Sequence, residues 1–446
     1  MFGHRGTEFM FIYHLKIAIA SLRRNPILSA LLIGGIALGI CVSTAFVTLR
    51  HLYTADPLPG RSDRLYYVRL DSWGIDRNFD GDDPKSVPDQ VTYRDARGLL
   101  RSPIPVRQTP TFVTNMFVHP DPKVARPFQP HVRLVFSDFF EMFGLRFQYG
   151  GPWTEAADAK PEQVVVIDHE TNEKVFGGEN SVGRDLRLEE RTWRVVGVLE
   201  PWRPPLRYWE MNRNPAGPPE PVYIPFNHIE PQEIWSSGNN SGWDGANIET
   251  HQDYLNSERI WLQYWVELPD ETTRAAYGDW ITAYITEQKK AGRFPRPVNF
   301  RLTRVPDLIE EFGLVPQGVK SMSVVALLFL GVCSLNLVGI LLGKFLARIP
   351  EVSVRRALGA SRAQIFWQHI IECELIGIAG GILGVIGSLG ILALLSRYMP
   401  NGDALKLDGE MLLLAAILSL VSGLVAGLYP AWRVCSVPPA MQLKIQ

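Results

Sequence analysis

Two short stretches of the sequence carry acidic or imidazole side chains at spacings close to those of metal-binding motifs. Residues 76–81, DRNFDG, match the first, third, fifth and sixth positions of an EF-hand calcium loop, but the twelfth position is Val87 in place of the bidentate glutamate. His169-Glu170 begins like the helical zinc-protease motif, yet Glu173 stands where the second histidine belongs. We therefore predict ordinary polar segments here and no metal site.

The sequence also lacks the usual motifs for binding nucleotide phosphates and for acyl transfer by a serine nucleophile. Residues 339–345, GILLGKF, approach a nucleotide-binding P-loop but are one residue short between the glycines and lack the final hydroxyl. No G-x-S-x-G nucleophile elbow occurs either. The sequence predicts a chain that is not itself an enzyme.

Composition narrows the class of protein further. The 446 residues include 45 basic and 46 acidic side chains, for a net charge of −1, and 46% are hydrophobic. Near-neutral charge excludes a nucleic-acid binder that relies on a basic surface, and the apolar content excludes a disordered chain.

Four uncharged blocks contain most of this apolar character. They hold 25, 23, 22 and 22 residues, between Arg24 and Arg50, Lys320 and Lys344, Glu374 and Arg397, and Glu410 and Arg433. A helix needs about 20 apolar residues to cross a hydrocarbon layer of about 30 Å. Each block predicts a transmembrane helix. The first is interpreted as an uncleaved anchor because it exceeds the usual signal-peptide core of about 7–15 residues.

The distribution of charge predicts the orientation of these helices. Residues 1–26, 344–374 and 433–446 together hold 11 basic and 4 acidic residues (+7), whereas the rest of the chain holds 34 and 42 (−8). The positive-inside rule places the first group on the cytoplasmic side of the membrane, which is expected to be a bacterial inner membrane. Lys344 at a helix C-terminal end and Glu372 at an N-terminal end also suit the helix dipoles.

The predicted fold class is an α-helical membrane protein with four transmembrane helices and a large α+β periplasmic domain inserted between helices 1 and 2. The order is a cytoplasmic amphipathic segment (1–25), helix 1 (26–49), the periplasmic domain (50–320), helix 2 (321–343), a cytoplasmic segment (344–370), helix 3 (371–396), a short loop (397–410), helix 4 (411–432) and a cytoplasmic tail (433–446). Asn25-Pro26 is expected to start helix 1, and translation to start at Met1 or Met10.

Each transmembrane block contains two glycines at a spacing of four. Small residues at this spacing let helix backbones approach closely, so we predict helix-packing positions. These are Gly35 and Gly39, Gly339 and Gly343, Gly377 and Gly381, and Gly423 and Gly427.

The periplasmic segment has strand-like runs at 65–70, 164–167, 193–198 and 260–266 and helical stretches near 93–100 and 272–288. It contains no cysteine, so it must fold without disulfides. Residues 200–260 stand apart because they are rich in proline and tryptophan. We interpret them as a long surface insertion, with an aromatic recognition surface as the alternative.

The segment after the second block reads EVSVRRALGASRAQI from Glu351 to Ile365. It resembles the permease signature of the MacB/FtsX superfamily, the type VII ABC transporters. LRRNP at 22–26, GLYPAWR at 427–433 and several short runs of the periplasmic segment are also similar to this family, whose plan has four spans and a large loop after the first. Pro350 and the 200–260 segment depart from the pattern.

The resemblance implies a coupling element that binds an ABC ATPase subunit. Carried onto this sequence, its residues are Glu351, Arg355, Arg356, Leu358, Gly359 and Ala360. Gly359 is expected to break a short helix, and the arginines to meet acidic groups of the partner. ATP and Mg would then be bound by that partner and no cofactor by this chain. MacB carries its ATPase fused, so a separate polypeptide is expected here.

The same resemblance implies function. The chain is expected to be a non-catalytic permease subunit of an export or extraction system that moves a periplasmic or outer-leaflet substrate. Its expected partners are a second permease copy or paralogue, membrane lipid, and a periplasmic adaptor with an outer-membrane exit duct. A lipoprotein-extraction permease and an FtsX-like signalling protein that regulates a periplasmic enzyme are the alternatives.

Overall fold

The computed structural model describes residues 16–76, 78–81, 83–210, 214–398 and 405–436. The chain divides into a helical unit, Met1–Ala55 with Val315–Gln446, and a globular domain, Asp56–Leu314. Four helices of the helical unit are long and apolar enough to cross a membrane, and the globular domain lies between the first two in sequence. The predicted fold class is confirmed.

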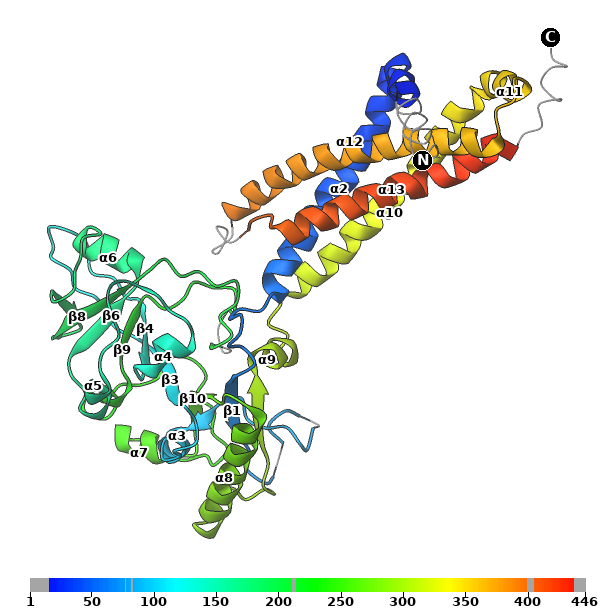
Figure 1. Cartoon of the computed structure of the whole chain (residues 1–446). Coiled ribbons are helices and arrows are strands. Elements are labelled where there is room, and N and C mark those ends of the chain that lie inside the picture. Colours follow the sequence, from blue (N-terminus) through cyan, green and yellow to red (C-terminus); the bar gives the residue numbers. More distant parts are fainter. Residues whose placement is uncertain (1–15, 77, 82, 211–213, 399–404, 437–446) are drawn as a thin grey trace, which may run out of the picture. The chain divides into compact units, whose positions relative to one another are not determined.

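A short helix, α11, connects the second and third of the four long helices (Figure 1). Their bounds are α2 (Pro26–Thr54), α10 (Gln317–Leu346), α11 (Ile349–Ala357), α12 (Arg362–Ser396) and α13 (Gly409–Ser436). Both α10 and α12 pack against α2 and against α13. Ile36 and Ile40 of α2 are buried in the resulting core.

The third long helix begins earlier than the sequence predicts. The Ser361 side chain accepts a hydrogen bond from the Gln364 backbone, and the Gln364 side chain accepts one from the Ser361 backbone, which forms a capping box. Residues 362–370, assigned to the cytoplasmic segment, are therefore helical and continuous with the span. Glu372 lies about three turns inside α12. The helix-dipole interpretation of Glu372 is wrong, because that effect fades within the first turn.

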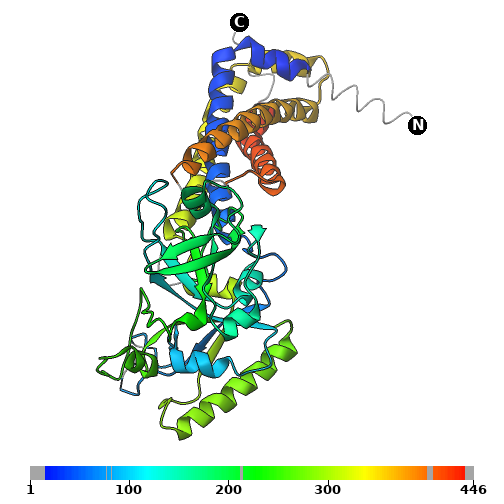
Figure 2. The same ribbon diagram turned by 90° about the vertical axis from the view of Figure 1, so that its left-hand side faces the viewer.

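Residues 16–24 form a separate helix, turned away from the axis of α2 in Figure 2. The break falls at Asn25, and Pro26 occupies the first turn of α2 as predicted, but the Asn25 side chain makes no capping hydrogen bond. Ser29 donates a hydrogen bond across the break to the Leu22 carbonyl at 3.0 Å. The alternative start at Met10 lies outside the described residues.

The globular domain is built on one 11-stranded sheet, in the order β11-β1-β10-β3-β4-β9-β6-β8-β5, with β2 on β10 and β7 on β8. The strands are β1 (Leu65–Leu70), β2 (Val91–Thr92), β3 (Arg107–Asn115), β4 (His131–Val135), β5 (Phe147–Gly150), β6 (Val164–Ile167), β7 (Asp185–Leu188), β8 (Arg191–Leu199), β9 (Val222–Pro225), β10 (Ile260–Glu267) and β11 (Phe300–Arg304). Only β4–β9 and β6–β8 pair in parallel; the remaining pairs run antiparallel.

Helices complete this α+β domain. They are α3 (Tyr93–Leu99), α4 (Asp138–Met142), α5 (Glu155–Ala159), α6 (His169–Phe176), the 3-10 helix η1 (Phe226–His228), α7 (His251–Asn256), α8 (Glu271–Lys290) and α9 (Val305–Glu311). The four predicted strands correspond to β1, β6, β8 and β10, and the two predicted helices to α3 and α8. These sequence predictions are confirmed.

The interpretation of residues 200–260 as a surface insertion is wrong. The segment supplies β9, which lies between β4 and β6 in the sheet. Tyr208 and Trp209 are fully buried, and the Trp243 ring nitrogen donates to the Ser72 carbonyl at 2.9 Å. Of the tryptophans in this segment, Trp202 and Trp243 are half-buried and Trp235 is 45% exposed. The aromatic rings were mistaken for surface features because their polar and proline-rich surroundings are typical of loops.

Candidate functional site

The predicted coupling element folds as α11 and the turn that follows it. Pro350 lies in the first turn of α11, where a missing backbone N–H costs no hydrogen bond. The proline that departs from the family pattern therefore starts this helix and does not kink it. Ile349 and Val352 bury one face of α11 in the core of the helical unit, together with Ile365 of α12.

The turn after α11 presents an apolar side chain to its surroundings. Gly359 has a φ of +100°, a region that residues with a side chain rarely adopt, and it ends the short helix as the sequence predicts. The preceding Leu358 is 83% exposed, and Val354 one turn earlier is 55% exposed. Ala360 returns to the core. Leu358 and Val354 thus place two exposed apolar side chains at the end of α11 and on the turn that follows it.

Two of the predicted arginines are already engaged within the chain. Arg355 forms an ion pair with Glu351 at 2.7 Å and donates to the Gln368 side chain of α12 at 3.1 Å. Arg356 is half-buried and also has an interaction within the chain. Arg355 therefore links α11 to α12, which the sequence did not predict.

A buried charged cluster lies beside the coupling element. Lys344 of α10 and Glu372 of α12 form an ion pair at 2.6 Å, and both side chains are at most 2% exposed. Arg348 approaches the second oxygen of Glu372 at 3.5 Å, and the Ser21 hydroxyl donates to its first oxygen. We call these four residues the bundle cluster. It connects residues 16–24, α10 and α12.

Sequence reasoning missed the bundle cluster, although a signal existed. Lys344 ends the second uncharged block and Glu372 lies two residues before Glu374, which begins the third, and the end of α10 and the start of α12 lie at the same end of the bundle. Groups of opposite charge at the same depth near an apolar layer are expected to form an ion pair. His369, one turn before Cys373 on α12, packs its ring on Phe345 at 4.4 Å and strengthens the same junction.

The predicted glycine positions divide into two groups. Gly377 and Gly423 face each other, and a Cβ on Gly377 would lie 3.3 Å from the Gly423 Cα. A Cβ on Gly39 would lie 2.7 Å from Leu330. Gly381 and Gly427 are equally restricted, by Ser419 and Cys373, and Gly35 lies in ordinary contact with Leu337.

Gly339 and Gly343 of α10 behave differently, since a Cβ on either would meet no atom within 4 Å. Packing within the chain does not account for this pair. Glycines of α12 outside the predicted set are also closely packed: a Cβ on Gly384 would lie 2.7 Å from the Ile40 Cβ and 2.9 Å from the Ala37 carbonyl oxygen.

A second buried charged cluster lies in the globular domain. Arg133 of β4 contacts Glu210 at 2.6 Å and Glu220 at 2.9 Å, and Arg207 contacts Glu220 at 3.1 Å. We call these four residues the domain cluster. Burial by itself raises the pKa of Glu220, but the charges of Arg133 and Arg207 and hydrogen bonds from Arg133 outweigh it and lower that pKa to about 2.

The stretches that resemble metal sites are occupied by ordinary contacts. The Asn78 side chain accepts a hydrogen bond from Arg296 at 2.8 Å, and His169 lies next to Gln148 and Glu173 at the start of α6. Among the described residues no group of three His, Cys, Asp or Glu side chains is placed to hold a metal ion.

Two family descriptions match the sequence. Residues 29–284, more than half of the chain, match the MacB-like periplasmic core domain, and residues 323–439 match the FtsX-like permease C-terminal family. The Bacillus subtilis protein named "Uncharacterized ABC transporter permease YvrN" is 22% identical, over 97% of this chain and 99% of its own length.

Other relatives are longer. The macrolide export ATP-binding/permease protein MacB of Agrobacterium fabrum is 26% identical over 77% of this chain, and that of Bradyrhizobium diazoefficiens 23% identical over 98%. The chain spans 47% and 61% of their lengths, respectively. The periplasmic region of MacB from Actinobacillus actinomycetemcomitans aligns with 59% of this chain and 99% of its own, at a TM-score of 0.38 and 16% identity.

Proposed function

Since the chain belongs to the family of ABC transporter permeases with a MacB-like periplasmic core and an FtsX-like permease domain, we propose that it is the membrane subunit of an ATP-driven export or extraction system. In this proposal the chain lies in a bacterial inner membrane. A separate ATPase binds α11 and the turn that follows it on the cytoplasmic side. ATP hydrolysis then moves the globular domain in the periplasm, which drives efflux of a periplasmic or outer-leaflet substrate.

The observation that carries the proposal is the exposed Leu358 on an ordered turn. Its side chain is 83% exposed, while the two flanking elements are held firmly by Val352, Ile365 and the Ser361 capping box. A rigid apolar protrusion can insert into a pocket of a partner and transmit a displacement, because it is not free to bend away. A second permease copy would complete the assembly, since one chain offers one such protrusion and an ATP-driven pair of ATPase subunits needs two.

The contacts of each side chain in α11 and its turn show which substitution tests this proposal without disturbing the fold. Arg355→Glu would also break the ion pair with Glu351 and so disturb the shape of α11. Leu358→Asp changes only an exposed side chain that contributes little to the core. Arg397→Glu is the matched control, since Arg397 is an exposed residue at the opposite end of α12.

The experiment is an affinity purification of the full chain from its native membrane, followed by mass spectrometry and an ATPase assay. We expect an ATPase to co-purify with the wild type and with Arg397→Glu, and to be lost from Leu358→Asp. Retention of the same ATPase by Leu358→Asp would contradict the assignment of the coupling element. Absence of any ATPase from the wild type would contradict the proposed function itself.

A further inference from the structure

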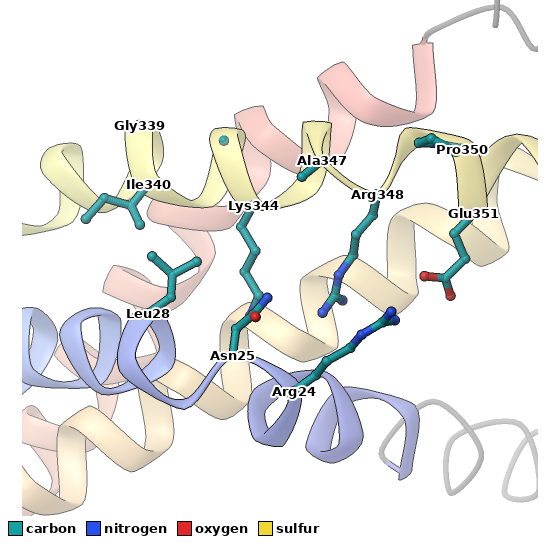
Figure 3. Close-up of a pocket in the computed structure, with 11 residues that line it drawn as sticks. Arg24, Asn25, Leu28, Gly339, Ile340, Lys344, Ala347, Arg348, Pro350 and Glu351 are labelled. Atoms are coloured by element: carbon teal, nitrogen blue, oxygen red, sulfur yellow. The ribbon is translucent and has the colours of Figure 1, made fainter. Parts of the chain in front are cut away.

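A pocket of about 620 Å³ opens on the helical unit beside the bundle cluster. Residues 24–28 line one side of it, and the last two turns of α10 with the first turn of α11 line the other. Figure 3 shows Lys344 of α10 and Arg348, just before α11, extending toward the facing segment, and Arg24 extending from that segment. Cationic side chains from two elements thus converge on one open space.

The charges around this pocket do not balance. Among the residues that the structure describes here, Arg24, Lys344 and Arg348 carry three positive charges, and Glu372 supplies one negative charge to two of them, which leaves a net charge of +2. Arg24 makes no ion pair with any residue that the structure describes. Glu351 also lines the pocket, but its charge is matched by Arg355. Lys344 is buried and Arg348 is 18% exposed, while Arg24 is exposed at the rim, so the excess positive charge faces the open space and favours an external anion.

The pocket changes character along its length. Past the cations it is lined by Leu28, Ile340, Gly339 and Gly343, which belong to the apolar membrane-spanning helices. The two glycines leave open space, because a Cβ on either would meet no atom within 4 Å. A cationic end followed by an apolar slot matches a ligand with an anionic head and a hydrocarbon chain.

We propose that this pocket binds an anionic phospholipid from the membrane leaflet at this end of the helical bundle. Its phosphate would lie among Arg24, Lys344 and Arg348, and an acyl chain would lie along Gly339 and Gly343. Basic pockets between membrane-spanning helices are suited to such headgroups. The site adjoins Pro350 at the start of α11, so the lipid also supports the base of the coupling element. This proposal does not depend on the ATPase, and its test uses none.

The test measures lipid retention by the full-length chain with native mass spectrometry. The protein is exchanged into mixed micelles that contain dioleoylphosphatidylglycerol and dioleoylphosphatidylcholine in equal amounts. Arg24→Gln removes one cation, and Gly343→Leu fills the slot without changing charge. Arg23→Gln is the matched control, since Arg23 precedes Arg24 on the same helix and does not line the pocket.

We expect the wild type and Arg23→Gln to retain phosphatidylglycerol over phosphatidylcholine. Arg24→Gln is expected to weaken that retention about fivefold, the effect of one basic residue at a membrane surface. Gly343→Leu is expected to reduce retention of the lipid but not to change the binding of inorganic phosphate, which has no acyl chain.

Three results would overturn the proposal. The first is equal retention of both lipids by the wild type. The second is an equal loss in Arg23→Gln, which would indicate a general effect of surface charge. The third is a Gly343→Leu variant that keeps its lipid but changes its oligomeric state, because the slot would then be covered by a second copy of the chain.

Discussion

In the domain cluster two arginines meet two glutamates, whereas in the bundle cluster Lys344 and Arg348 share the single carboxylate of Glu372. The domain cluster is sealed: its ion-paired side chains are at most 5% exposed. The bundle cluster borders an open pocket, and its Arg348 side chain is 18% exposed. The first arrangement is complete within the chain, and the second is complete only with an external anion.

The two clusters show that buried charged residues can either stabilise the fold or form a binding site. The balanced and sealed cluster ties the segment that holds Arg207, Glu210 and Glu220 to β4, because each member would be left uncompensated if another were removed. An unbalanced cluster beside a pocket retains the capacity to bind. The same residue types thus stabilise one region and create a binding site in the other, and the deciding quantity is the local count of charges.

The largest expected effect concerns the domain cluster. Glu220→Gln leaves Arg133 and Arg207 with one carboxylate, and we expect it to lower the free energy of unfolding of the globular domain by about 3–5 kcal/mol. Urea unfolding followed by tryptophan fluorescence measures this, since the Trp209 ring nitrogen donates to Glu220 at 3.3 Å. Glu287→Gln on the exposed side of α8 should change the value by less than about 0.5 kcal/mol. Equal effects of the two variants would contradict the comparison.

The same cluster predicts a dependence on pH. The pKa of Glu220 is lowered from its ordinary value of 4.5 to about 2, so its contribution to stability is fully present above pH 4.5 and is lost as the pH falls toward 2. We expect the urea midpoint of the wild type to fall through this range. The difference between wild type and Glu220→Gln should shrink over the same range, and a constant difference would show that Glu220 does not titrate there.

In the bundle cluster, removal of the carboxylate has two opposite effects. Glu372→Gln leaves Lys344 buried without its partner, which we expect to destabilise the helical unit by about 1–3 kcal/mol. It also raises the net charge at the pocket from +2 to +3, so retention of phosphatidylglycerol should increase about fivefold. Thermal melting and native mass spectrometry measure the two responses.

The control for this variant is Glu374→Gln. Glu374 lies two residues further along α12 and makes no ion pair with any residue that the structure describes. Its substitution should leave lipid retention unchanged. If Glu372→Gln lowered both stability and lipid retention, the bundle cluster would resemble the domain cluster and the distinction between them would fail.

The smallest expected effects distinguish the glycines of α12 and α10. Gly384→Ala places a Cβ 2.7 Å from Ile40, and we expect a loss of about 1–3 kcal/mol in the stability of the helical unit. Gly339→Ala meets open space and should stabilise α10 by up to about 1 kcal/mol through its higher helix propensity. Thermal melting of the two variants tests this. Similar losses in both would indicate that Gly339 is covered in the assembled protein.

Much of the architecture was predictable because it depends on local composition. The four spans follow from uninterrupted apolar length, β1 and β6 match the predicted strands residue for residue, and Gly359 ends α11 because glycine tolerates a positive φ. The prediction for residues 200–260 failed because the sequence pattern of tryptophans in a proline-rich segment is the same whether their side chains are buried or exposed. Their burial depends on partners far away in sequence, such as Phe143 beside Trp209 and Ser72 beside Trp243.

By itself, then, the sequence determined the number of spans, the α+β character of the inserted domain and the position of the turn at Gly359, since each depends on periodicity, length or one residue's backbone freedom. Only the tertiary structure decided which charges meet. Arg133 and Glu220 are 87 residues apart, and Ser21 and Glu372 are 351 apart. Whether such groups balance or leave an excess is set by the packing of distant helices and strands, because electrostatic attraction between buried groups is decided by a few ångströms of separation.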